Sequence, residues 1–175
     1  MTVFIALLRS VNVGGTAKFP MADLKSLCED AGFTKVKTYI ASGNVLFEAE
    51  HGEEKVKAIL EKRVQAYVGR SIPVLVRTAA QMAAVAKTNP FPKTDPAHTV
   101  AIFLDEPPAK DTAATARGRT IEEIRLGKRE IYVHYGKGMG NTKLKLRAAE
   151  NGTARNINTI MKLAALAAAY AEKAS

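Results

Sequence analysis

The segment Thr2–Gly15, TVFIALLRSVNVGG, decides the architecture that we expect for this chain of 175 residues. Its apolar part predicts a β-strand over Val3–Leu8, in which successive side chains point to opposite faces. Both faces of this strand are apolar, whereas a strand in a single two-layer fold has one polar face. We therefore expect strand Val3–Leu8 to be buried on both faces, with a further layer covering its sheet.

The segments that follow alternate between helical and strand periodicity. They predict a helix at Met21–Ala31, strands at Val36–Ile40 and Val45–Ala49, a helix at Glu53–Val68 and a strand at Ile72–Arg77. The resulting order β-α-β-β-α-β is that of the ferredoxin-like plan. The first half of the chain is therefore predicted to form one ferredoxin-like half.

The second half predicts a similar order. Its elements are helices at Ala79–Ala86, Ala109–Arg117, Lys143–Glu150 and Asn156–Glu172, and strands at Thr99–Leu104, Thr120–Leu126 and Glu130–Tyr135. Prolines between the halves indicate a linker, so we divide the chain into residues 1–88, 89–96 and 97–175. The predicted fold is α+β: two ferredoxin-like (α/β plait) halves with antiparallel sheets packed together, plus a C-terminal helix.

Charge is the most informative feature of the composition. The formal net charge is +9, and the segment from Arg125 to Lys162 holds nine Lys or Arg residues against two acids. A clustered basic region suggests an anionic partner such as nucleic acid, nucleotide or phosphate. A solvated basic surface that aids solubility explains the same pattern, and both interpretations stay open here.

The sequence offers little for membrane, metal or cofactor chemistry. Apolar residues make up 47% of the chain, but none of their runs reaches the roughly 20 residues of a membrane span, and Val3–Leu8 is too short for a signal peptide. We expect a cytoplasmic protein with no membrane partner. Cys28 is the single cysteine and the three histidines lack ligand spacing, so no metal and no cofactor are expected. Cys28 itself is predicted to be a buried structural thiol.

Three stretches resemble a known family. They are ALLRSVNVGG at Ala6–Gly15, TYIASGNVLF at Thr38–Phe47 and TARNINTIMKLAALA at Thr153–Ala167. In this order they resemble the signature stretches of a bacterial family known as domain of unknown function 1697. The resemblance implies ferredoxin-like α/β halves and no established activity. This chain has Ser10 where the family commonly has glycine, and Ile157 where it commonly has tryptophan.

The residues after the first strand form one candidate anion site. Arg9 has a planar guanidinium suited to carboxylate or phosphate, and Asn12, Gly14, Gly15 and Lys18 follow it. They could form an anion-accepting loop that leads to a helix N-terminus. They could instead form a structural turn held by Asn12, with Arg9 paired to an acid of the protein.

Two further stretches add candidates. Ser42 and Asn44 flank the glycine of a predicted turn, which could be purely structural. Arg155, with Asn156 and Thr159, stands at or just before the start of the closing helix. The helix dipole disfavours a cation there, so Arg155 is expected to have an anion nearby, either a ligand or an acid of the protein.

Strand topology predicts that Asn44 lies close to Arg9, because the first and third strands of a ferredoxin-like half are antiparallel neighbours. We predict a single pocket in which Arg9 and Arg155 bind a phosphate or carboxylate. The predicted function is the binding of a small anionic ligand such as a nucleotide. The alternative is sequence-tolerant binding of nucleic acid through a basic surface, without the stacking aromatics of an RNA-recognition motif. The sequence predicts neither a reaction nor an oligomeric state.

Overall fold

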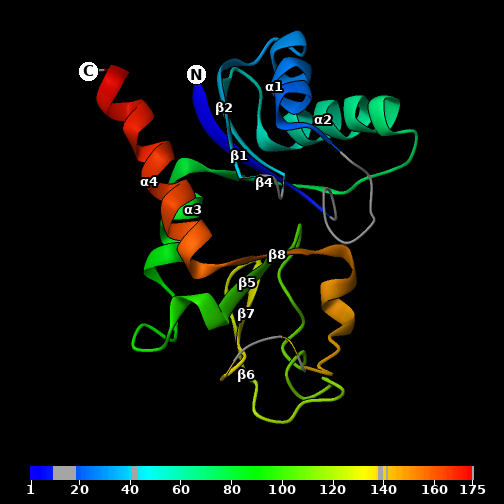
Figure 1. Ribbon diagram of the computed structural model, residues 1–175, viewed down its shortest axis with the longest axis vertical. Helices are drawn as coiled ribbons and strands as arrows, with labels where there is room; N and C mark the ends of the chain where they lie inside the picture. Colours follow the sequence, from blue (N-terminus) through cyan, green and yellow to red (C-terminus); the bar gives the residue numbers. More distant parts are fainter. Residues whose placement is uncertain (10–18, 41–42, 138–139, 141, 175) are drawn as a thin grey trace. The chain divides into compact units, whose positions relative to one another are not determined.

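The structure, a computed structural model, describes residues 1–9, 19–40, 43–137, 140 and 142–174. The chain forms two compact units (Figure 1). Unit 1 comprises residues 1–82 and 163–175, and unit 2 comprises residues 83–162. The residues after Lys162 belong to unit 1, so this unit is made of two separate stretches of the chain.

Unit 1 contains a four-stranded antiparallel sheet, and each of its two inner strands is followed in the chain by a helix. The strands are β1 (Thr2–Leu8), β2 (Thr34–Tyr39), β3 (Asn44–Ala49) and β4 (Val74–Thr78), in the spatial order β2-β3-β1-β4. Helices α1 (Met21–Asp30) and α2 (Glu53–Val68) lie on one face of this sheet (Figure 1). The predicted order β-α-β-β-α-β is thus confirmed for this part of the chain.

The core of unit 1 follows from the alternation within each strand. Phe4, Ala6 and Leu8 of β1 point to the helix face, where they join a buried cluster with Leu24 of α1 and Leu60 of α2. Phe33 and Phe47 stack in the same cluster with ring centroids 4.4 Å apart. The apolar stripes of both helices are thereby buried against the sheet.

The opposite face of β1 is buried as well. Ile5 and Leu7 are fully inaccessible to solvent, as are Leu46 of β3 and Leu75 of β4, which pair with them. The prediction that strand Val3–Leu8 is buried on both faces is therefore confirmed for Phe4 through Leu8. Tyr170, which belongs to unit 1, donates its hydroxyl to the carbonyl oxygen of Lys35 at 2.6 Å.

Unit 2 contains a second four-stranded antiparallel sheet. Its strands are β5 (Thr99–Phe103), β6 (Glu123–Leu126), β7 (Glu130–His134) and β8 (Thr153–Asn156), in the order β6-β7-β5-β8. Two short 3₁₀ helices, η1 (Pro96–His98) and η2 (Arg147–Asn151), flank it. The longer helices α3 (Ala79–Lys87) and α4 (Ile157–Ala174) each begin in one unit and end in the other. The described part of the chain is thus a mixed α+β fold with two antiparallel sheets and four α-helices, of which α4 is the predicted C-terminal helix.

Three elements of unit 2 differ from the prediction. The predicted helix Ala109–Arg117 is not formed, because residues 110–115 form turns in which the hydroxyls of Thr112 and Thr115 donate to the carbonyls of Ala109 and Asp111, and Arg117 lies in a β-bridge. The predicted helix Lys143–Glu150 is wrong, since the chain is non-helical up to Leu146 and only then enters η2. The strand β8 was not predicted, and α4 begins directly after it. None of the described helices is both long enough and apolar enough to cross a membrane.

Candidate functional site

The ends of three strands meet at the edge of the unit 1 sheet that carries Arg9. Leu7 pairs with Asn44, the backbone N–H of Leu8 donates to the carbonyl of Gly43 at 2.9 Å, and the N–H of Arg9 donates to Pro73 at 3.1 Å. The backbone of Arg9 therefore lies beside the start of β3, as the topology predicts. The Arg9 side chain is partly exposed, and no described residue forms a hydrogen bond or ion pair with it.

Asn44 has a structural role at this edge. It is fully buried, and its side-chain Nδ2 donates to the carbonyl of Tyr39 at 2.9 Å. This bond closes the β2–β3 turn, where Ile40 and Gly43 both have positive φ. The structural interpretation of the turn is supported for Asn44. The predicted site residues Asn12, Gly14, Gly15, Lys18 and Ser42 lie outside the described residues, and their roles stay predictions.

Arg155 lies in strand β8, two residues before α4, which agrees with its predicted place at or just before the start of the closing helix. It pairs with Ala101 of β5 and is only 8% exposed. Its Nη1 donates to Thr153 Oγ1 at 2.8 Å and to the Ala154 carbonyl at 2.9 Å. Burial lowers the pKa of Arg155 to about 10. The guanidinium therefore remains charged at neutral pH inside unit 2.

Asn156 and Thr159 are joined by the cap of α4. The side-chain Oδ1 of Asn156 accepts the backbone N–H of Thr159 at 2.9 Å, the geometry of an N-cap residue and its N3 partner. This bond explains the asparagine at position 156 without a ligand. Arg9 belongs to unit 1 and Arg155 to unit 2, and the pocket that we predict for them stays a prediction.

Exposed cations gather at a different place in unit 2. Arg117 and Lys145 form a backbone bridge, with the Arg117 N–H donating to Lys145 at 3.0 Å and the Lys145 N–H donating to Arg117 at 2.7 Å. Bridge partners in a β-ladder project their side chains to the same side. Arg119, Lys143 and Arg147 stand nearby in sequence and are also exposed. We call Arg117, Arg119, Lys143, Lys145 and Arg147 the basic surface.

Alternation explains why these cations face solvent. In the run Lys143-Leu144-Lys145-Leu146-Arg147, the two leucines pack against the buried cluster of unit 2. Ala116, which precedes Arg117, packs against the same cluster. Because alternate residues of an extended segment point to opposite sides, the leucines face the cluster and the basic side chains face solvent, as in a half-buried strand. This alternation was the sequence signal for an extended segment, although we predicted a helix there.

Two features hold the segments of the basic surface together. Gly118 has φ +69°, and a Cβ at this position would overlap the carbonyl oxygen of Lys143. Glu122 accepts hydrogen bonds from Thr142 Oγ1 at 2.6 Å and from the Thr120 N–H at 2.7 Å. These bonds, that from Thr142 first, lower the pKa of Glu122 to about 2. The Glu122 carboxylate thus ties residue 142 to residue 120, beside the cations.

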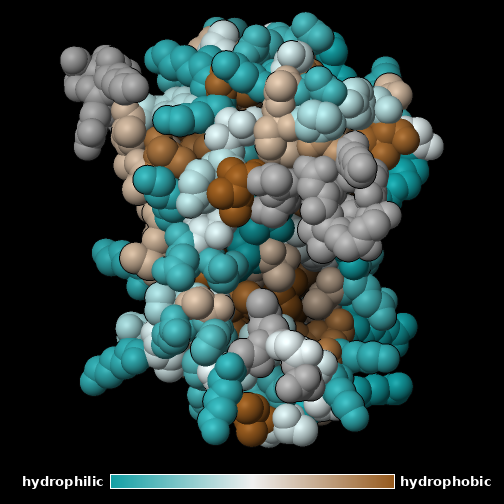
Figure 2. Space-filling model, in the orientation of Figure 1, coloured by the Kyte–Doolittle hydropathy of each residue, from teal (hydrophilic) through white to brown (hydrophobic). Residues whose placement is uncertain are grey.

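The chemistry of the basic surface is that of an anion-binding surface. Arg117 and Lys145 are like charges directly opposite each other, an arrangement that destabilises a bare ladder. An anion placed between such side chains would relieve their repulsion. Hydrophilic side chains project from much of the face shown in Figure 2, so exposure alone also fits a solvated surface.

Metal and thiol chemistry find no support among the described residues. They contain no group of three or more His, Cys, Asp or Glu side chains that could hold a metal ion. Cys28 is fully buried in the core of unit 1, and this burial, with a smaller effect of Glu29, raises the pKa of its thiol to about 12. The prediction of a buried structural thiol is confirmed.

Comparisons with known proteins agree with the fold. No curated protein matches the sequence. A solved structure, that of the conserved bacterial protein SP0830 from Streptococcus pneumoniae, is similar with a TM-score of 0.79 at 23% identity, covering 95% of this chain and 98% of that one. At this identity the likeness shows the fold alone. The family described as Protein of unknown function (DUF1697) matches residues 1–132. Because this match covers most of the chain, the protein belongs to that family, as the resemblance of its signature stretches indicated.

Proposed function

We propose that the protein binds the phosphate backbone of single-stranded nucleic acid, with little sequence preference, through the basic surface. The observation that carries this proposal is the bridge between Arg117 and Lys145, which joins two separate runs of exposed cations. Neither run alone is unusual. Together they form a cluster of positive charge, and phosphate neutralisation is the main source of sequence-independent affinity for nucleic acids.

The geometry favours a polymer over a single small anion. Alternate residues of an extended segment lie about 6.7 Å apart, so Lys143 and Lys145 present separate charges rather than one converging fork. The cations are exposed, and no described residue forms an ion pair with any of the five. Aromatic residues make up only 6% of the chain, which supports an electrostatic and sequence-tolerant mode rather than base stacking.

A small anionic ligand such as a nucleotide is the second candidate function. It is supported by Arg9, whose partly exposed guanidinium lies where the ends of three strands meet. Such an anion would bind Arg9 together with the predicted residues that follow it.

We also propose that both sheets belong to ferredoxin-like plaits. The strand order β2-β3-β1-β4 with α1 and α2 on one face supports a ferredoxin-like plait for unit 1. In unit 2 the order β6-β7-β5-β8 is the same in plan, with turns at residues 110–115 in place of the first helix. We also propose a cytoplasmic location, where both ligand classes are abundant.

The salt dependence of binding tests the first candidate. The probe is a fluorescein-labelled oligothymidylate of about 20 nucleotides, measured by anisotropy between about 50 and 200 mM salt. If all five cations contact phosphates, log K should fall with log salt at a slope of about −3.5, an affinity loss of about a hundredfold over this range. The double variant Lys143→Gln, Lys145→Gln should make the slope shallower by about 1.4.

The matched control is Lys55→Gln, Lys62→Gln, which removes two exposed lysines from helix α2. It should leave the slope unchanged. Equal slopes for the two double variants would contradict the assignment to the basic surface. A different result would support the small-anion candidate. In that case an equimolar free nucleotide would displace the oligonucleotide, and Arg9→Gln would abolish the binding of both the nucleotide and the oligonucleotide.

A further inference from the structure

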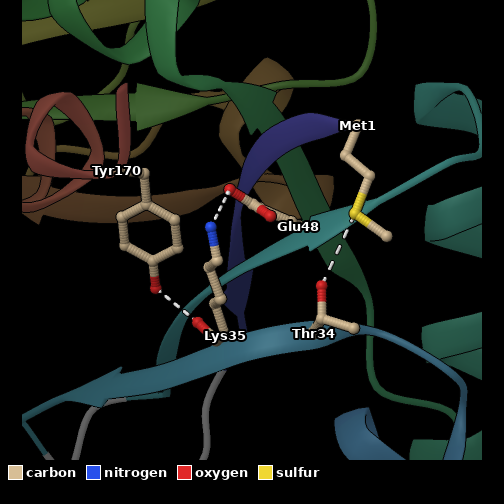
Figure 3. Close-up of polar contacts among 5 residues, drawn as sticks. All are labelled: Met1, Thr34, Lys35, Glu48 and Tyr170. Atoms are coloured by element: carbon tan, nitrogen blue, oxygen red, sulfur yellow. Dashed lines mark hydrogen bonds and ion pairs between the residues drawn. The ribbon is translucent and has the colours of Figure 1, made fainter. Parts of the chain in front are cut away.

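A groove of about 460 Å³ lies in unit 1 between the edge of β2 and helix α4. Lys35, Val36 and Lys37 form one wall, and Leu166, Ala169 and Tyr170 form the other. Figure 3 shows Tyr170 reaching from α4 towards the backbone of Lys35. Val36 also packs against the core under α1 and α2, whereas its two lysine neighbours are exposed. The groove thus has an apolar helical wall and a basic strand wall.

The strand wall of this groove is an open sheet edge. Strand β2 is the outermost strand in the order β2-β3-β1-β4, so one side of its backbone pairs with no strand of the described chain. An antiparallel strand turns the N–H and C=O of alternate residues to this outer side. At Lys35, where φ is +50° and the register shifts, the Tyr170 hydroxyl already bonds the carbonyl oxygen at 2.6 Å. Tyr170 supplies there the hydrogen bond that a neighbouring strand would supply.

The charges at the groove select its occupant. Lys35 Nζ lies 3.2 Å from Glu48 Oε1, and this pair is drawn in Figure 3. Lys37, by contrast, forms no ion pair with any described residue. A second copy of the chain that paired β2 with β2 in antiparallel fashion about Val36 would set Lys35 opposite Lys37, which destabilises the ladder. A partner segment with carboxylates would instead place opposite charges across the new pair.

We propose that the edge of β2 binds an extended acidic peptide segment as an added strand. The segment's backbone bonds the outer edge of β2 beyond Lys35, one of its carboxylates contacts Lys37, and an apolar side chain packs on Leu166 and Ala169. Backbone pairing supplies affinity and the side-chain contacts supply specificity, as in other cases of strand addition. This site uses unit 1 residues, so it does not depend on the basic surface of unit 2.

The test uses the acetylated, amidated peptide Thr-Val-Glu-Leu-Glu-Val-Thr carrying a fluorophore, with anisotropy as the readout. The acidic peptide should bind about tenfold more tightly than a counterpart with lysine in place of glutamate. Lys37→Glu should weaken binding of the acidic peptide by at least about tenfold. Peptides N-methylated at alternate residues should differ, because only one of the two registers removes the N–H groups that face β2.

Two controls separate this site from general attraction to a basic protein. Lys62→Glu makes the same charge change on helix α2, and Lys143→Gln, Lys145→Gln removes two of the five charges of the basic surface; each should leave peptide affinity within about twofold. Circular dichroism checks that Lys37→Glu is folded. Absence of binding, equal binding of both peptides, indifference to N-methylation, or equal effects of Lys37→Glu and Lys62→Glu would each overturn the proposal. Self-association of the chain through β2 would also overturn it. Displacement of the peptide by decanoate, a carboxylate with an apolar chain and no peptide backbone, would overturn it as well.

Discussion

Gly118→Ala is the substitution that most directly links the fold of unit 2 to the basic surface. Gly118 stands between Arg117 and Arg119, with φ +69°. A Cβ there would overlap the backbone of Lys143, which the neighbouring bridge of Arg117 with Lys145 holds in place. The methyl group therefore cannot be accommodated by moving a flexible side chain, and the two segments must separate.

The expected loss of stability has two parts. An alanine in the left-handed region costs roughly 1–2 kcal/mol. Separation of the segments weakens the two hydrogen bonds between Arg117 and Lys145, which contribute about 0.5–1.5 kcal/mol each. We therefore expect Gly118→Ala to lower the free energy of unfolding by roughly 2–5 kcal/mol.

Gly69→Ala provides the matched control. Gly69 has φ +86°, but a Cβ there would meet no atom within 4 Å. It should therefore lose only the conformational part, about 1–2 kcal/mol. Urea denaturation followed by circular dichroism measures both losses. At temperatures where both variants are folded, only Gly118→Ala should weaken oligothymidylate binding. Equal losses of stability in the two variants would refute the argument from close approach.

Two further predictions concern Glu122 and the cap of α4. Hydrogen bonds lower the pKa of Glu122 from its ordinary value of 4.5 to about 2, so its contribution to stability is complete above pH 4.5 and is lost as the pH falls towards 2. When the stability of Glu122→Gln is measured against pH, the part of the acid loss that is due to Glu122 should be absent. An acid stability profile identical to that of the unmodified protein would contradict this prediction. Asn156→Ala should lower the free energy of unfolding by about 1 kcal/mol, because the Thr159 N–H loses its acceptor. A loss of anion binding with no change in thermal stability would instead make Asn156 a ligand-binding residue.

Unit 1 could be predicted from the sequence because each element there carries one clear period. Strand β1 is a short run of apolar residues that fills both faces of a buried strand. Helix α2 has Val56, Leu60 and Val64 at helical spacing. Gly69 ends α2 with a left-handed residue, as C-terminal glycines do. Local preference and tertiary packing agree at all of these positions, so a reading of periodicity alone reaches the right order of elements.

Unit 2 was harder because its local preferences conflict with its packing. Ala109–Arg117 is rich in alanine, yet its threonines bond to nearby carbonyls and the segment forms turns. Thr153–Asn156 is too short for its periodicity to distinguish a strand from a helix. It becomes a strand only because β5 offers an open edge. Gly152, at its start, fits tightly beside the Phe103 carbonyl, a contact that sequence alone does not reveal.

The candidate site shows why residue type alone predicts ligand binding poorly. Asparagine is favoured at turns and helix caps for the same hydrogen-bonding ability that suits it to ligands. Asn44 and Asn156 use that ability on the carbonyl of Tyr39 and the N–H of Thr159, respectively. Exposed Lys and Arg side chains at alternate positions are not required to satisfy backbone N–H or C=O groups in this way. Those opposite one another, as in Arg117 and Lys145, oppose folding through repulsion. A charge arrangement that the fold does not require is therefore a stronger indication of a binding partner than a polar residue at a turn.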